Sequence, residues 1–402
     1  MSGTSDLSGD PVSARIAASD FVPRRILITA DAVGGVWTHA IDVAAGLRQH
    51  GIEVILAVLG PGPSGAEMAR ARHIADVVSL PLPLDWTAQH PAEIEAAARE
   101  VSRLAADVSA DLVHLNSPAL AAYGHFRAPV VALAHSCVAT WWDAVRTGPL
   151  PQDFEWRTEL IGRGYSNASI VVAPSEAFAK ATASRYELAA VRTVHNGRAA
   201  PASLESDIDS KAGSGGDDHA ASAESLFVLT AGRLWDEGKN VATLDAIADR
   251  VSVPVFAAGP LAGPQGGGFG SQRLQTLGLL SEPALRRLYA KQPIFASPAL
   301  YEPFGLAVLE AAQAGCPLVL SDIPTFRELW DGAAIFVPAR DEAALASAID
   351  ELATDSDRRA RMGEAARERA LRFTPERMVA GLLDVYRTVL STPARKMKEV
   401  AA

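Results

Sequence analysis

The stretch from Tyr301 to Ala312, Tyr-Glu-Pro-Phe-Gly-Leu-Ala-Val-Leu-Glu-Ala-Ala, decides how the fold of this chain is interpreted. Its first part predicts a loop, because Pro303 has no backbone N–H to donate and Gly305 relaxes the limits on backbone dihedral angles. Good helix formers follow from Leu306 to Ala314. The stretch therefore predicts a loop that leads directly into a helix N-terminus.

Glutamates stand on both sides of this predicted helix start. Glu302 precedes it, and Glu310 lies about a turn and a half inside, roughly 8 Å along the axis. Between them the helix presents free backbone N–H groups and the positive end of its dipole, which together favour an anion. Two carboxylates that bind hydroxyl groups, one on each side of an anion site, suit a nucleotide diphosphate sugar. One glutamate would hold the sugar, the amides the pyrophosphate, and the other glutamate the ribose diol.

The Glu-x7-Glu pattern resembles the one in retaining glycosyltransferases of the GT-B fold, family 4 in particular. Spacing alone is more typical of a solvated helix face, but Pro303, Phe-Gly-Leu and the downstream turn Ala-Gly-Cys-Pro-Leu-Val favour the functional interpretation. The resemblance runs from Arg25 to about Leu390. It implies an α/β chain of two Rossmann-like domains, with parallel sheets facing each other across a cleft. It also implies the roles of this stretch: Glu302 is catalytic, and the substrate-binding residues are Phe304, Gly305, Leu306 and Glu310.

A glycine pair follows the first predicted strand, within Asp31-Ala-Val-Gly-Gly-Val-Trp-Thr-His. Gly34 and Gly35 allow a backbone to approach a ligand closely at the start of a helix. A simple strand-to-helix turn explains the same residues equally well. The pair resembles the first glycine loop of the family 4 enzymes, which implies that Gly34 and Gly35 bind the donor across the cleft.

His135 ends an apolar strand, and the carboxyl ends of such strands line the ligand crevice in doubly wound sheets. A lone histidine there is more often structural, but the resemblance implies a catalytic place against the donor sugar. Asn196, with Gly197, resembles the hinge-side turn of the family and is expected to bind substrate. Asn116-Ser117 and Trp141-Trp142 are assigned to the acceptor side on position alone, although the tryptophan pair is equally consistent with packing.

Two cations follow the first strand of the second half, in Ala231-Gly-Arg-Leu-Trp-Asp-Glu-Gly-Lys-Asn. Arg233 and Lys239 flank a turn at a strand end, so both are expected to converge on one diphosphate. Fixed cations stabilise the charge that grows on a departing nucleotide diphosphate without a metal. The spacing also resembles the Arg and Lys pair of family 4, which implies that both residues are catalytic.

No metal and no cofactor are predicted. Asp207-Ile-Asp209 has the Asp-x-Asp form of metal sites in the other large transferase fold, but it lies in a low-complexity segment. Asp355-Ser-Asp357 is interpreted as a helix cap between two helical stretches. No zinc signature, phosphate-binding loop or nucleophile elbow is present in the sequence.

Strand and helix signals alternate along the chain, which favours parallel α/β layers. Thr374-Pro-Glu-Arg-Met begins a last helix with a capping residue and a proline at its first position, and the resemblance implies that this helix returns to the first domain. The predicted organisation is a disordered N-terminal tail (1–22), an acceptor domain (23–200), a flexible linker (201–225), a nucleotide-sugar domain (226–374) and the returning helix (375–391). The predicted strands are Arg25–Thr29, Glu53–Leu59, Leu112–Leu115, Val130–Ala134 and Ile170–Ala173, then a second series at Leu226–Thr230, Val253–Ala258, Ile294–Ala296, Pro317–Leu320 and Ile335–Val337.

Composition narrows the functional classes. The net charge of −10 argues against nucleic-acid binding, and no cluster of lysine and arginine suggests more than peripheral membrane contact. Two cysteines are too few for a disulfide framework, and the polar N-terminus lacks the pattern of a signal peptide. A cytoplasmic protein is expected.

The function that these features predict is transfer of a hexose from a nucleotide diphosphate sugar to an acceptor hydroxyl, with retention of configuration and without a metal. This places the chain in carbohydrate biosynthesis, with a sugar, a glycolipid or a small molecule as acceptor. A nucleotide-sugar epimerase of the same fold is the alternative, because Glu302 and His135 also suit acid–base chemistry. A catalytically silent sugar-nucleotide sensor is less consistent with Arg233, Lys239, Glu302 and Glu310 occurring together.

Overall fold

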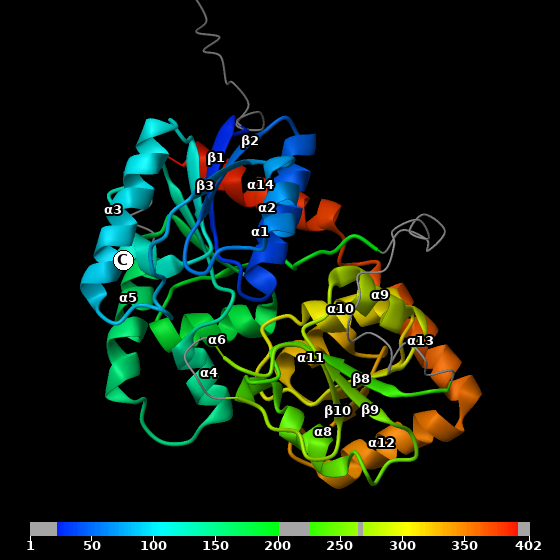
Figure 1. Cartoon of the computed structure of the whole chain (residues 1–402). Coiled ribbons are helices and arrows are strands. Elements are labelled where there is room, and N and C mark those ends of the chain that lie inside the picture. The colour runs from blue at the N-terminus through cyan, green and yellow to red at the C-terminus, as the bar shows by residue number, and fades with distance from the viewer. Residues whose placement is uncertain (1–21, 201–224, 264–267, 393–402) are drawn as a thin grey trace, which may run out of the picture.

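The computed structural model describes residues 22–200, 225–263 and 268–392. Apart from Val22 and Ser225, the predicted tail and linker, including Asp207 and Asp209, lie outside the described residues. Two lobes are present, each an α/β unit built on a parallel sheet, as predicted (Figure 1). None of the described helices is both long and apolar enough to cross a bilayer.

The first sheet has the order β3-β2-β1-β4-β5-β6-β7, and every pairing is parallel. Its strands are β1 (Arg25–Ala30), β2 (Glu53–Val58), β3 (Asp76–Ser79), β4 (Leu112–Leu115), β5 (Val130–Leu133), β6 (Ile170–Ala173) and β7 (Arg192–Thr193). Its helices are α1 (Gly35–Gln49), α2 (Gly65–Arg72), α3 (Pro91–Asp107), η1 (Pro118–Ala122, a 3-10 helix), α4 (Val138–Val145), α5 (Gln152–Asn167) and α6 (Glu176–Tyr186).

The second sheet has the order β10-β9-β8-β11-β12-β13 and is also parallel. Its strands are β8 (Val228–Ala231), β9 (Val255–Ala258), β10 (Gln275–Gly278), β11 (Ile294–Ser297), β12 (Leu318–Ser321) and β13 (Ile335–Val337). The helices of this half are η3 (Glu237–Lys239, a 3-10 turn), α8 (Val241–Ile247), α9 (Glu282–Ala290), α10 (Leu306–Gln313), α11 (Pro324–Trp330), α12 (Glu342–Thr354), α13 (Ser356–Ala370) and α14 (Pro375–Ser391).

Helices cover both faces of each sheet. Successive residues of a strand point to opposite faces, so each strand contributes side chains to both layers. In β1, Ile26 and Ile28 pack with α1 and α14, whereas Leu27 packs with α3. In β8, Leu229 faces α10 and α13, whereas Val228 faces α8 and α12. Strands buried on both faces are mainly apolar, which is why the hydrophobic runs located them.

The last helix, α14, crosses back to the first lobe and lies against α1 (Figure 1). Thr374 caps it by accepting a hydrogen bond from the backbone N–H of Arg377, and Pro375 occupies its first position. Asp355 likewise caps α13, accepting from the backbone N–H of Arg358, as its sequence position predicted. The predicted helix Leu306–Ala314 ends one residue earlier, at Gln313, because Gly315 follows with a positive φ.

The contact between α1 and α14 leaves no room for a side chain at Gly46. A Cβ there would lie 2.4 Å from Cγ2 of Val379. Gly46→Leu is therefore expected to destabilise the first lobe by about 1–3 kcal/mol through overpacking, and to lower the melting temperature by several degrees. Gly65→Leu is the control, since a Cβ at Gly65 meets nothing within 4 Å. Equal melting temperatures for both variants would contradict this account of the contact.

Candidate functional site

The glycine loop of the first lobe meets the second lobe directly. Gly34 is the N-cap of α1 with φ 78°, a conformation that L side chains rarely adopt. A Cβ at Gly34 would lie 3.2 Å from Nη1 of Arg233, and one at Gly35 would lie 3.1 Å from Cδ1 of Leu306. The predicted glycine pair therefore faces the predicted cation and the start of α10 across the cleft between the lobes.

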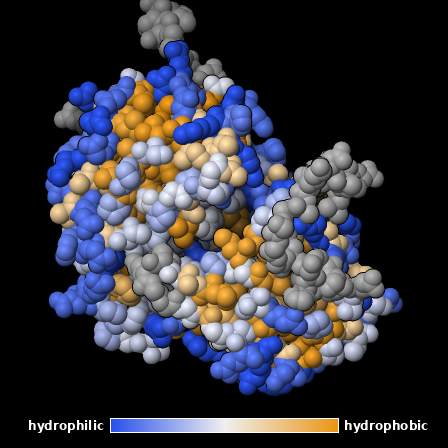
Figure 2. All heavy atoms as spheres, viewed as in Figure 1, coloured by the Kyte–Doolittle hydropathy of each residue, from blue (hydrophilic) through white to orange (hydrophobic). Residues whose placement is uncertain are grey.

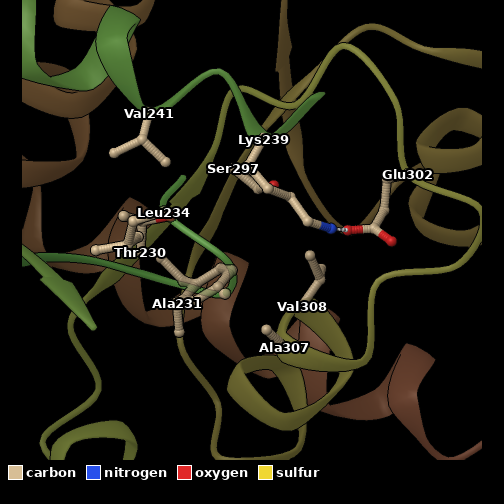
Figure 3. Close-up of a pocket in the computed structure, with 11 residues that line it drawn as sticks. Thr230, Ala231, Leu234, Lys239, Val241, Ser297, Glu302, Ala307 and Val308 are labelled. Carbon is tan, nitrogen blue, oxygen red and sulfur yellow. Dashed lines mark hydrogen bonds and ion pairs between the residues drawn. The ribbon is translucent and has the colours of Figure 1, made fainter. Parts of the chain in front are cut away.

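Glu302 and Lys239 form an ion pair in the second lobe (Figure 3). Lys239 ends η3, after strand β8, and Glu302 lies in the loop before α10. Their side chains are 20% and 14% exposed, so the pair is largely shielded from water. The structure pairs Lys239 with the carboxylate of Glu302. The convergence of Lys239 and Arg233 on one diphosphate stays a prediction.

Arg233 instead pairs with Asp236, with 2.9 Å between Nη2 and Oδ2. Burial raises the pKa of Asp236, but the charges of Arg233 and Lys239 lower it more, so the group is held ionised. Asp236 Oδ1 also accepts a hydrogen bond of 2.9 Å from Nε1 of Trp141, which belongs to the first lobe. This carboxylate therefore orients Arg233 and joins the lobes at the same time.

Glu310 contacts a residue that the sequence analysis did not single out. Arg198 donates from Nε to Glu310, from Nη1 to Asp42 on α1, and from Nη2 to Glu282 on α9, each at 3.0 Å. Burial raises the pKa of Glu310, although the charge of Arg198 opposes the rise. Arg198 comes directly after the turn Asn196-Gly197, and that proximity was the only sequence signal for it.

The predicted binding residues at the start of α10 differ in how far they are exposed. Gly305 is the N-cap of α10 with φ 93°, and Leu306 is partly exposed toward the glycine loop. Phe304 is only 3% exposed and packs edge-on against Phe373, with ring centroids 5.6 Å apart. The Phe304 side chain therefore supports the loop from the core, and the predicted role of this residue in substrate binding stays a prediction.

His135 belongs to a cluster of three histidines at the cleft, in which His39 and His114 are buried and His135 is partly exposed. Its Nε2 lies 2.6 Å from Oδ1 of Asn116, and Nε2 of His114 lies 3.2 Å from the same oxygen. Asn116 Nδ2 donates to the carbonyl of Thr29, so Oδ1 must accept and both histidines donate from Nε2. The third ring, His39, is 4.7 Å from that of His135 between centroids.

The cluster is electrically neutral. Burial lowers the pKa of His39 to about 4 and of His114 to about 3, and it lowers the pKa of His135 well below its usual range. His135 is therefore not an acid at neutral pH; it offers a neutral ring to the cleft. Asn196 is also buried, and it lies close enough to His39 to oppose part of the fall in the pKa of that ring.

The depressed pKa values make stability depend on pH. The unfolded chain protonates its histidines near pH 6.5, whereas the folded chain does so near pH 4 at His39, so stability is lost as pH falls below 6.5. The shift at His39 should lower the free energy of unfolding by about 2 kcal/mol between pH 7.5 and 5. Urea melts across this range should show the loss. His39→Gln should flatten the dependence and exposed His125→Gln should not; equal slopes would contradict the assignment.

A cavity of about 420 Å³ opens between the lobes next to these residues. Figure 2 shows a recess between the two lobes. Asn116, Ser117 and Trp141 line the cavity, as assigned, but Trp142 does not; its indole donates to the carbonyl of Gly148. The wall also contains His135 and Arg233, and the residues that the sequence analysis did not assign to a site include Asp31, Asp85, Trp86, Arg157 and Trp235.

Metal ligands were not predicted, and within residues 22–200, 225–263 and 268–392 the structure brings together no group of three or more His, Cys, Asp or Glu suited to a metal. The charged groups at the site are instead paired with one another, as Lys239 with Glu302 and Arg233 with Asp236. The arrangement offers cations to an anion and carboxylates to hydroxyl groups.

Comparison with known proteins identifies relatives of both lobes. Residues 33–198 match the model of the family described as Glycosyltransferase Family 4, and residues 270–369 match that of Glycosyl transferases group 1. A phosphatidyl-myo-inositol mannosyltransferase from Mycobacterium leprae is 26% identical over 91% of this chain and 96% of its own length. A D-inositol 3-phosphate glycosyltransferase from Salinispora arenicola is 31% identical, over 29% of this chain and 27% of its own.

Solved structures agree with the fold. A sucrose-phosphate synthase from Thermosynechococcus elongatus superposes with a TM-score of 0.72 at 18% identity, covering 92% of this chain and 99% of that one. An Anabaena protein solved in complex with UDP and glucose gives a TM-score of 0.66 at 18% identity, covering 91% and 100%. These likenesses concern the arrangement of the two lobes.

Proposed function

Because this chain belongs to the family 4-like glycosyltransferases of the GT-B fold, we propose that it transfers a hexose from a nucleotide diphosphate sugar to an acceptor hydroxyl, with retention of configuration. The observation that carries the proposal is the pair Lys239 and Glu302 in front of α10. It sets a cation and a hydroxyl-binding carboxylate beside a helix N-terminus, with Arg233 across from the glycine loop.

Each group receives a role in this proposal. The start of α10 and the cations Lys239 and Arg233 bind the diphosphate. Glu302 positions the hexose. Glu310 binds the ribose diol, whose hydroxyl groups take the place of Arg198 at the carboxylate or bind beside it. His135 presents a neutral ring to the hexose, since its low pKa keeps it unprotonated.

The chemical step in this proposal takes place on one face of the sugar. The bond from the anomeric carbon to the phosphate oxygen breaks, and the bond to the acceptor oxygen forms on the same side. The acceptor proton passes to the departing phosphate oxygen, so no side chain needs to form a covalent intermediate. Lys239 and Arg233 stabilise the charge that develops on the diphosphate.

The test combines three measurements. Release of nucleoside diphosphate from a panel of nucleotide sugars is measured with and without candidate sugar, glycolipid and small-molecule acceptors, and NMR then assigns the anomeric configuration of the product. Transfer with retention is expected, and an inverted product would overturn the retaining step. An epimerised nucleotide sugar formed without acceptor would favour the epimerase instead.

Metal independence is tested in the same assay. The paired cations and the helix dipole already supply the positive charge that a divalent ion would bring. We expect excess chelator to leave the transfer rate within about twofold of the untreated rate. Full loss of activity that magnesium or manganese restores would contradict this expectation.

A further inference from the structure

The cavity between the lobes has a chemical character that the proposed transfer does not by itself require. Its wall includes His135 and Arg233, where the donor hexose is proposed to lie, and on the first lobe it also includes residues that follow β1 and residues of η1 and α5. A pocket of about 420 Å³ falls in the size range of small-molecule sites. The part beyond the hexose is therefore the space available to an acceptor.

Carboxylates line this deeper part. Asp31 Oδ1 accepts a hydrogen bond of 2.9 Å from the backbone N–H of Val33, and Asp85 Oδ1 accepts one of 3.0 Å from the hydroxyl of Ser117. Burial raises the pKa of Asp31 to about 6, and burial also raises the pKa of Asp85. The charge of Asp85 adds to the rise in the pKa of Asp31, so the two carboxyl groups interact electrostatically across this part of the cavity.

The cations on the wall are already engaged. Arg157 is 8% exposed and donates to the carbonyls of Asp85, Ala88 and Asp153 and to the carboxylate of Asp153. Arg233 is paired with Asp236, and in the proposed transfer it is occupied by the diphosphate of the donor. Among the residues that line the cavity, no other lysine or arginine occurs, and His135 is neutral. A phosphate in this space would meet carboxylates without a free cation.

Aromatic surfaces complete the wall. Trp86, Trp141 and Trp235 all line the cavity, and Trp141 is held by its hydrogen bond to Asp236. The flat apolar faces of indole rings pack against the C–H faces of sugar rings, while carboxylates accept hydrogen bonds from hydroxyl groups. Carboxylates next to tryptophans are therefore suited to an uncharged, polyhydroxylated ring.

We propose that the acceptor is an uncharged sugar or cyclic polyol, bound by Asp31 and Asp85 against the tryptophan wall, and that a phosphorylated acceptor is excluded. This inference rests on the proposed transfer reaction, because only that reaction makes the bound sugar an acceptor. The binding preference itself can be tested without catalysis. It separates this chain from relatives whose names specify an inositol phosphate. At separations of several ångströms, a phosphate facing two carboxylates in a shielded pocket is repelled strongly.

The experiment is calorimetric titration of the full chain at pH 8, above the pKa of Asp31, with and without UDP or GDP. The probes are phenyl glucoside, phenyl mannoside and myo-inositol, each compared with its own monophosphate ester. At least one neutral probe should bind, and its phosphate ester should bind at least about tenfold more weakly. A phosphate ester that binds as well as its parent, or a complete lack of binding by the neutral probes, would overturn the inference.

Variants locate the effect. Asp85→Asn removes the carboxyl group that faces the proposed acceptor and should reduce the gap between each neutral probe and its ester, while Asp107→Asn on the exposed face of α3 should not. The two proposals fail in different ways. If neutral probes bind but no nucleotide sugar is bound or cleaved, the transfer proposal fails and the pocket preference stands. If transfer proceeds best to phosphorylated acceptors, the pocket preference fails and the transfer stands.

Discussion

Lys239→Ala is expected to lower kcat for transfer about 10²–10³-fold, the loss typical of removing one fixed group that stabilises developing charge. The Lys239 side chain is only 20% exposed and its ammonium group already contacts Glu302. The substitution removes the cation from the diphosphate and leaves the carboxylate of Glu302 without its partner. Both effects act on the proposed donor site, so the melting temperature should change by only a few degrees.

The matched control for this variant is Arg250→Ala. Arg250 is a cation of the same lobe in an exposed pair with Glu342, where both side chains are 48% exposed. Its loss should leave kcat unchanged, since exposed pairs contribute little. Arg233→Ala should resemble Lys239→Ala. Turnover near that of the parent chain in either cleft variant would refute the assignment of these cations to the diphosphate.

Glu310→Ala is expected to weaken nucleoside diphosphate and intact donor alike, by tenfold or more, because about 1.5–3 kcal/mol accompanies a carboxylate–hydroxyl hydrogen bond. Glu302→Ala should leave nucleoside diphosphate affinity nearly unchanged and lower turnover heavily, because its proposed contact positions the reacting carbon. Calorimetry with the diphosphate and steady-state kinetics provide the comparison. If Glu302→Ala weakened the diphosphate and Glu310→Ala did not, the donor would lie in the site with its hexose and ribose ends exchanged.

Arg198 supplies the control for Glu310. Glu310→Ala also removes a partner of Arg198, which joins α1 to α9 and α10. Glu282→Ala removes a different partner of the same guanidinium and leaves Glu310 in place. If Glu282→Ala weakened the diphosphate as much as Glu310→Ala, the effect would belong to the ion network and not to the ribose.

The sequence predicted the interior strands well and the edge strands poorly. Strands such as β4 and β12 are buried along their whole length, so they appear as apolar runs. Strands β3 and β10 lie at sheet edges and keep part of their residues exposed, so Asp76–Ser79 and Gln275–Gly278 contain no such run. The edge strand β13 was predicted all the same, because Ile335–Val337 is apolar. Exposure at the edge hid β3 and β10, and exposure depends on the whole fold.

Some residues of the site could be predicted from the sequence, and others could not. The motif around Glu302 was visible because loop, helix start and both glutamates lie within one short segment. Arg198 was not, because Asp42, Glu282 and Glu310 reach it from three distant parts of the chain. The histidine cluster is similar, since His39, His114 and His135 come from α1, β4 and the end of β5. Long-range packing creates these groups, and no local pattern records it.

The return of α14 to the first lobe has a consequence for biosynthesis. Met378, Val379, Leu382, Leu383, Val385, Tyr386 and Val389 belong to the same core as β1 and α1. A ribosome makes these residues after the entire second lobe, although domains ordinarily fold in the order of synthesis. Until they emerge, the apolar face of α1 lacks its cover. The first lobe is therefore the last to be completed, and a nascent chain halted before Thr374 would expose that face to chaperones or aggregation.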